Sequence, residues 1–215
     1  MIRIAISIEG STEMEFCKKV LTPFFRNHNI EMIPVTICTS KDKCGRKSKG
    51  GSVNIDRIKS EVSKLLPSHD YVTTFYDFYG FAKRPTDNIE ELEKILFELF
   101  SNEKFIPYVQ QYEFETLIFS KPEYYKEYFG NNVVTEKMKY IISEFQEDIE
   151  KINDSPQTAP SKRIEKLFEE VGESYDKVFH GEGIAGDMGM TVLMSRATRF
   201  NNWINKIIAV GSSHD

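Results

Sequence analysis

The chain has 215 residues, a formal net charge of −5 at pH 7 and 40% hydrophobic side chains. This length and apolar content are sufficient for a well-packed core. The negative charge argues against a protein that coats nucleic acid without sequence preference, although bound divalent metal would make a carboxylate-rich site less negative. The three cysteines have no His or Cys neighbours at zinc spacing, which argues against a zinc finger and against a disulfide framework.

No apolar run approaches the length of a membrane span, and the chain begins directly with a strand-like run instead of a charged and then apolar leader. We therefore expect a cytoplasmic protein without a membrane partner.

The first stretch predicts a buried strand that turns into a helix. Residues Ile2 to Ile8 are apolar and rich in β-branched side chains, and Gly10 follows them. Apolar residues then recur at helical spacing, so we expect a helix entered at residue 11 or 12 and ending near residues 27–29. Glu9 and Glu13 then lie at the carboxyl end of a core strand, where open α/β sheets hold their ligands.

The next segments alternate between strand and helix patterns. Strands are expected over 30–38, where Pro34 suggests a bulge or an edge position, over 70–75 and over 105–110; helices are expected over 55–66 and 89–100. The segment 39–52 is rich in Lys, Arg and Gly and is expected to be a loop, either simply solvated or gripping a phosphate backbone.

Helical patterns replace strands after Pro122, over 137–151, 161–171 and 184–210. The expected organisation is an α/β core over 1–120, a helical extension packed on it over 121–210, and a frayed tail over 211–215. The fold class is therefore α/β, with a mostly parallel four-stranded sheet flanked by helices and a helical C-terminal extension.

Acidic residues follow three of the predicted strands. Glu9 and Glu13 follow the first, Asp77 follows the strand over 70–75, and Glu113 and Glu115 follow the strand over 105–110. Because parallel strands end at the same edge of a sheet, these three clusters are expected to meet there.

Carboxylate oxygens without His or Cys partners suit Mg²⁺ or Mn²⁺. Two such ions roughly 4 Å apart can activate water, align a phosphodiester and stabilise the departing oxygen. A glutamate at the start of a helix is also an ordinary capping choice, so Glu13 has a purely structural alternative. Of Glu113 and Glu115, we expect one to point into the site and the other to support it or face water, with Glu113 preferred.

Four motifs resemble a bacterial family classed as a domain of unknown function. They are Ile8-Glu9-Gly10-Ser11-Thr12-Glu13, Tyr76-Asp77-Phe78-Tyr79-Gly80, Glu113-Phe114-Glu115 and Pro160-Ser161-Lys162-Arg163. That family is similar to the TOPRIM domains of overcoming-lysogenization-defect (OLD) type nucleases, topoisomerases and primases, so the resemblance implies a TOPRIM-like, Rossmannoid sheet. Its genes often lie beside ATPases of the ABC or SMC type in defence-like contexts, which implies an ATPase partner and a role in phage defence.

The resemblance also assigns roles to individual residues. Glu9 matches the motif glutamate, Glu13 the second acid of OLD-type proteins and Asp77 the first acid of the D-x-D pair, all of which bind Mg²⁺. Tyr79 stands where the second aspartate would be. This departure leaves three alternatives. Glu113 or Glu115 supplies the missing ligand, the site binds only one metal ion, or the activity is weak or lost.

Lys162 and Arg163 are candidates for holding the scissile phosphate, and a helix start with solvated cations is the alternative. The leading hypothesis is a Mg²⁺-dependent nuclease acting on DNA or RNA. The alternatives are a non-catalytic module that docks on an ATPase and a small nucleotide-binding or phosphoryl-transfer domain of flavodoxin-like topology.

Overall fold

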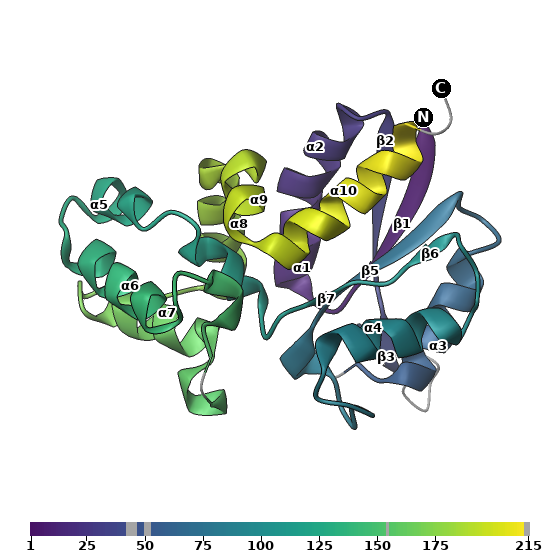
Figure 1. Cartoon of the computed structure of the whole chain (residues 1–215), viewed down its shortest axis with the longest axis horizontal. Coiled ribbons are helices and arrows are strands. Elements are labelled where there is room, and N and C mark those ends of the chain that lie inside the picture. The colour runs from purple at the N-terminus through teal and green to yellow at the C-terminus, as the bar shows by residue number, and fades with distance from the viewer. Residues whose placement is uncertain (42–46, 50–52, 154, 213–215) are drawn as a thin grey trace.

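The computed structural model of the chain describes residues 1–41, 47–49, 53–153 and 155–212. It is an α/β fold whose sheet has the strand order β2-β1-β5-β6, with β7 also paired to β5, and every pairing in this sheet is parallel (Figure 1). The strands of this sheet are β1 (Ile2–Ile8), β2 (Ile30–Thr36), β5 (Tyr71–Asp77), β6 (Phe105–Ile106) and β7 (Val109–Gln110).

Helices cover both faces of the sheet. Buried residues of β1 and β5 such as Ile6 and Phe75 pack against α1 (Ser11–Phe16), α2 (Thr22–Arg26) and α10 (Thr198–Ser212) on one face. On the other face, Val72 of β5 packs against α3 (Ile55–Leu65) and α4 (Ile89–Glu98). The sheet is therefore enclosed, as its continuous apolar strands require.

The first helix is interrupted by one turn of π-helix, η1 (Cys17–Leu21), between α1 and α2. Together these elements run from Ser11 to Arg26, close to the expected helix. Cys17 lies in the turn and is a free, fully buried thiol; the side chains of Cys38 and Cys44 lie outside the part of the chain that the structure describes.

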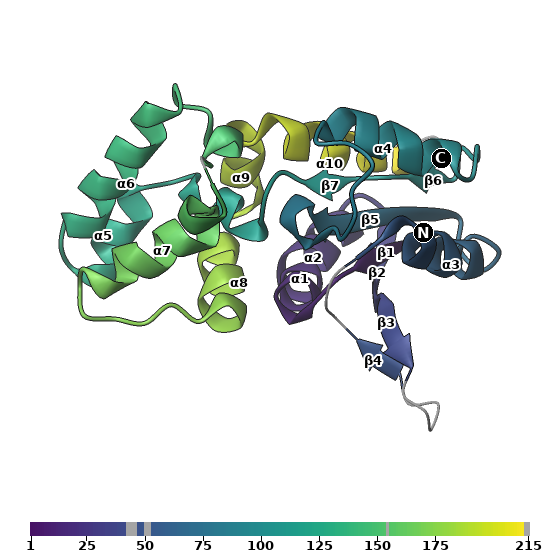
Figure 2. The ribbon, with the colours of Figure 1, turned by 90° about the horizontal axis from the view of Figure 1, so that it is seen from below.

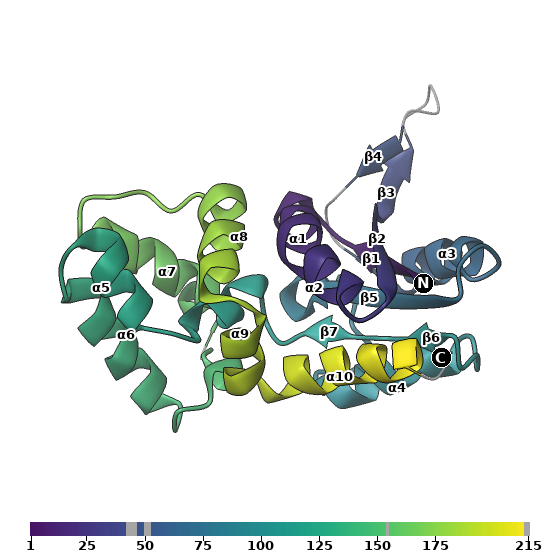
Figure 3. The ribbon, with the colours of Figure 1, turned by 90° about the horizontal axis from the view of Figure 1, so that it is seen from above.

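The helical C-terminal region forms a second group of elements at one end of the molecule (Figures 1 and 2). Its helices are α5 (Glu123–Phe129), α6 (Val133–Glu144), α7 (Pro160–Glu169), α8 (Lys177–Met188) and α9 (Met190–Arg196), and its short 3₁₀ turns are η3 (Phe114–Phe119), η4 (Ile149–Lys151) and η5 (Pro156–Thr158). Helix α10 then returns along the sheet (Figure 3).

The return of α10 is fixed by buried polar contacts. The Trp203 indole N–H donates to Thr73 Oγ1 of β5 at 2.9 Å. At the start of α10, the Glu150 carboxylate accepts the backbone N–H groups of Arg199 and Phe200 at 2.8 and 3.2 Å. Near its end, a side chain at Gly211 would collide with Ile30. The helix that closes the chain is therefore part of the sheet's packing.

The structure corrects the strand that we expected over 105–110. Pro107 has no N–H, and the strand divides there into β6 and β7. The Thr74 hydroxyl replaces the missing ladder contacts, because its oxygen accepts the Tyr108 N–H at 2.9 Å and its proton is donated to the Tyr108 carbonyl oxygen at 2.8 Å. Pro34 lies on β2, which is an edge strand as expected.

The expected loop over 39–52 is also different. Strands β3 (Cys38–Lys41) and β4 (Lys47–Lys49) pair in an antiparallel ribbon that extends from the sheet (Figures 2 and 3). Neither run has the apolar alternation that sequence patterns detect. The rest of that loop, residues 42–46 and 50–52, lies outside the described residues.

The expected helix bounds changed where the backbone reverses. The helix expected over 137–151 starts earlier, at Val133, and ends at Glu144, shortly before Gln146 and Glu147 adopt positive φ angles of 57° and 64°. The helical tail starts at Lys177 and is interrupted at Gly189, whose φ is 78°. In the part of the chain that is described, no helix is both long and apolar enough to cross a membrane.

Candidate acidic site at the carboxyl edge of the sheet

The carboxyl ends of β1 and β5 border a hollow of about 340 Å³. Glu9 follows β1, Glu13 lies in the first turn of α1, Asp77 ends β5, and Glu113 immediately precedes η3; all four line this hollow. The parallel sheet therefore brings together acids that lie more than a hundred residues apart in the sequence.

Glu13 also has the capping role that its position suggests. Its Oε2 accepts the Gly10 backbone N–H at 2.8 Å, at the start of α1. The helix starts at Ser11, and its N-cap residue is Gly10, which has no side chain to cap it. Glu13 therefore closes the turn between β1 and α1 while its carboxylate borders the hollow.

Asp77 has a carboxylate oxygen with no compensating donor in the described part of the chain. Its Oδ1 is buried and has no hydrogen-bond partner among the described residues. Burial, followed by the charges of Glu13 and Glu115, raises the pKa of Asp77 well above its ordinary value. An orphaned, buried carboxylate oxygen that faces other acids is costly unless a cation or proton reaches it.

The pKa values of Glu9 and Glu13 are raised as well. Burial and then the nearby Glu13 raise the pKa of Glu9 to about 7. Burial raises the pKa of Glu13, although the hydrogen bond from Gly10 opposes the shift. The site therefore holds more negative charge than its protein partners neutralise, which is a feature of functional sites.

Close packing at Gly80 shapes the hollow. A Cβ atom at this position would overlap the Glu9 carboxylate. Tyr79, the neighbouring residue, lines the hollow, receives a hydrogen bond from the Asn153 amide and packs its ring 5.5 Å from that of Tyr112. The aromatic side chain thus occupies the position that the resemblance assigns to a second aspartate.

Glu113 and Glu115 have different surroundings. Glu113 borders the hollow and accepts the Ser161 N–H at 2.9 Å, at the start of α7. Glu115 is only 1% exposed and does not line the hollow; the Tyr175 hydroxyl donates to its Oε1 at 3.5 Å. Burial raises the pKa of Glu115 to about 7, although Lys177 opposes the shift. Glu113 therefore lines the hollow, whereas Glu115 is buried and does not.

Lys162 and Arg163 do not line the hollow. Lys162 pairs with Glu165 at 2.6 Å on the outside of α7. The Arg163 Nε donates to the Thr158 carbonyl at 2.9 Å, and its guanidinium lies over the Phe145 ring. The cation that the structure brings to the acids is Lys177 of α8, 3.3 Å from Glu115 and 3.8 Å from Glu113. Its sequence neighbours carry no motif that would have singled it out.

The side chains that line the acidic hollow have the right chemistry for a hard divalent cation, but they are not arranged as a complete coordination sphere. The side chains offer carboxylate oxygens, which Mg²⁺ and Mn²⁺ prefer, and Asp77 Oδ1 has no hydrogen-bond partner among the described residues. Among the described residues, no group of three or more His, Cys, Asp or Glu side chains has the spacing of a metal site as it stands. The Glu13 and Glu113 carboxylates already accept hydrogen bonds from backbone N–H groups. We therefore expect a cation to bind to Glu9 and Asp77 before it binds to Glu13 or Glu113.

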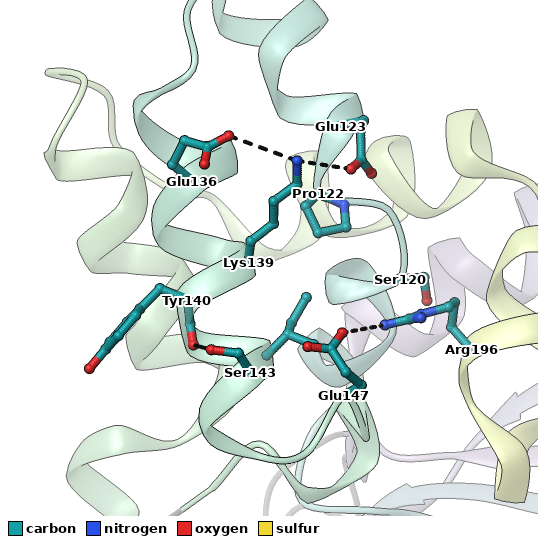
Figure 4. Close-up of a pocket in the computed structure, with 10 residues that line it drawn as sticks. Ser120, Pro122, Glu123, Glu136, Lys139, Tyr140, Ser143, Glu147 and Arg196 are labelled. Carbon is teal, nitrogen blue, oxygen red and sulfur yellow. Dashed lines mark hydrogen bonds and ion pairs between the residues drawn. The ribbon is translucent and has the colours of Figure 1, made fainter.

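A larger hollow, of about 740 Å³, lies between α5, α6 and α9 (Figure 4). Its charges are already paired: Lys139 contacts Glu123 at 3.1 Å and Glu136 at 3.8 Å, and Arg196 contacts Glu147 at 3.8 Å. Figure 4 shows the Tyr140 ring pointing away from these groups. The Nε atom of Arg196 is buried and has no hydrogen-bond partner among the described residues, so this hollow also contains one unmatched polar atom.

The sequence matches the family model of a domain of unknown function, DUF4276, over residues 8–208. The chain belongs to the DUF4276 family. The matched part of this DUF4276 domain includes the acidic edge of the sheet, the helical region and most of α10. No curated protein and no solved structure matches the chain.

Proposed function

We propose that this DUF4276 protein is a metal-dependent phosphodiesterase: a TOPRIM-type nuclease that acts as the effector of an ATPase-linked defence system. The observation that carries the proposal is the buried, unpartnered Oδ1 of Asp77 at the end of a parallel strand, beside Glu9, Glu13 and Glu113. The four motifs resemble a family that is in turn similar to TOPRIM and OLD-type proteins, and this resemblance supports the same function.

Glu9 and Asp77 would hold Mg²⁺ or Mn²⁺, with Glu13 as a further ligand. The bound ion would supply charge neutralisation to a phosphate group and lower the pKa of water. Gly80 leaves room for the Glu9 carboxylate, because a Cβ atom there would overlap it. Glu113 holds the start of α7 against the site through the Ser161 N–H.

Plasmid nicking and RNA cleavage in Mg²⁺ or Mn²⁺ test the proposal. We expect Glu9→Gln and Asp77→Asn, which preserve shape and remove charge, to lower the cleavage rate by about a hundredfold or more without loss of folding. Glu31→Gln is the matched control, because Glu31 lies on β2 with a half-exposed side chain. Cleavage by both site variants at the parental rate would show that the acids are not the site.

A non-catalytic module that docks on an ABC- or SMC-type ATPase is the second candidate. It is favoured by the hydrogen bonds and ion pairs that occupy Glu13, Glu113 and Glu115 with protein donors. Calorimetric titration with Mn²⁺ separates the two candidates. A nuclease site binds the ion in a way that Asp77→Asn abolishes, whereas a vestigial acidic edge gives no heat that depends on Glu9 or Asp77.

A further inference from the structure

Among the described residues, Lys177 is the one cationic side chain that forms ion pairs with the acids at this edge of the sheet. Its ammonium group lies 3.3 Å from Glu115 Oε1 and 3.8 Å from Glu113 Oε1. A lysine side chain is positively charged at neutral pH, so Lys177 forms ion pairs with both carboxylates.

Two local contacts hold the backbone at the start of α8 in place. Asp176 caps the helix by accepting the Phe179 N–H at 2.8 Å. One turn later, Gly181 allows close packing, because a Cβ there would lie 3.0 Å from both the Phe114 ring and the Tyr175 hydroxyl. Phe114 belongs to η3, the element that also carries Glu115. The backbone at Lys177 is thus fixed relative to η3, and its half-exposed side chain reaches the acids from there.

The acids at this edge therefore divide into two groups. Glu113 and Glu115 have Lys177, the Ser161 N–H and the Tyr175 hydroxyl as partners. By contrast, Asp77 Oδ1 has no donor, and the Glu9 carboxylate has no hydrogen bond or ion pair to any described residue. The unmet negative charge lies on the Glu9 and Asp77 side of the hollow.

We propose that Lys177 is a tethered internal cation that takes the place of a second divalent ion, so that the site binds one ion, between Glu9 and Asp77. This inference rests on the proposed function, because it assumes that the hollow binds a divalent cation. A fixed ammonium group at Glu113 and Glu115 repels a second ion and uses the carboxylates that would hold it. It also accounts for an aromatic Tyr79 in place of another acid.

Counting bound Mn²⁺ by calorimetry and by native mass spectrometry tests the inference. We expect one ion per chain in the parent protein and two in Lys177→Met, because removal of the ammonium group frees Glu113 and Glu115 as ligands. Lys177→Arg should restore the count to one. Lys19→Met is the control and should bind one Mn²⁺ ion. Lys19 pairs with Glu182, an acid of α8, and neither residue lines the hollow.

Two ions on the parent protein would overturn the inference, as would a single ion of unchanged affinity in Lys177→Met. If Lys177→Met does not fold by circular dichroism, Lys177→Gln and the count on the parent protein decide the matter. No Mn²⁺ bound to the parent protein at all would instead refute the proposed metal-dependent function.

Discussion

Replacing Glu9 with glutamine should raise the free energy of unfolding of the metal-free protein at alkaline pH. It should lower the free energy of unfolding only when metal is present. Burial, followed by the charge of Glu13, raises the pKa of Glu9 from 4.5 to about 7 in the folded state. The cost of ionising this buried acid is absent below pH 4.5, grows as the pH rises, and is complete above about pH 7. Glutamine has the same shape and no such cost.

The size of the effect follows from the shift. One pKa unit corresponds to about 1.4 kcal/mol, so the full shift corresponds to about 3 kcal/mol. Because the Glu9 side chain is partly exposed, solvent screening reduces this to about 1–2 kcal/mol. We therefore expect the free energy of unfolding of Glu9→Gln to exceed that of the parent by this amount at pH 8, and by only about 0.5–1 kcal/mol at pH 5.

Urea unfolding with a chelator at pH 5 and pH 8 measures the difference. Glu31→Gln controls for loss of a surface carboxylate, because Glu31 is 50% exposed and makes only a 3.7 Å pair with Arg3. Its effect should be the same at both pH values within about 0.5 kcal/mol. A loss of stability in metal-free Glu9→Gln at pH 8, or a gain that does not depend on pH, would refute the reasoning.

Three further substitutions probe the site and its support. Gly80→Ala should weaken Mn²⁺ binding in calorimetry by about tenfold or more, because the added methyl group displaces the adjacent carboxylate, whereas Gly183→Ala, with nothing within 4 Å of the added atom, should leave it unchanged. Trp203→Phe should lower the free energy of unfolding in urea by about 1–2 kcal/mol through loss of the hydrogen bond to Thr73, and an effect below about 0.5 kcal/mol would contradict that role. Asn88→Ala should cost about 1 kcal/mol in the same assay, since the Asn88 side chain accepts an N–H of the first turn of α4; a neutral outcome would show that water replaces the cap.

Elements defined by local burial patterns were predictable from the sequence. The strand over 2–8 and the helix over 55–66 appear as β1 and α3, because each sequence records which side chains face the core. Pro34 indicated an edge strand for a local reason as well, since a proline cannot donate to a central ladder.

Elements that depend on distant partners were not predictable to the same degree. The division of the strand at Pro107 is tolerated because the Thr74 hydroxyl, on another strand, takes over its hydrogen bonds. The end of α6 depends on two residues with positive φ, neither of them glycine, which no helix-stop pattern marks. Tertiary packing decides both features.

The candidate site shows the same division. Parallel topology alone predicts that acids after different strands share one edge, and the structure places Glu9, Asp77 and Glu113 around one hollow. The approach of Lys177 depends on how α8 packs against η3 and α1, which no local pattern encodes. Sequence reasoning selected Lys162 instead, and that side chain pairs with Glu165 on the outside of α7.

A crystal structure of the protein soaked in Mn²⁺ tests the central claim most directly, because anomalous scattering locates the ion without any assumption about activity. We predict one anomalous peak in the acidic hollow, in contact with the carboxylates of Glu9 and Asp77, and none in crystals of Asp77→Asn. A fully soaked crystal without a peak in that hollow, or with the same peak in Asp77→Asn, would contradict the account.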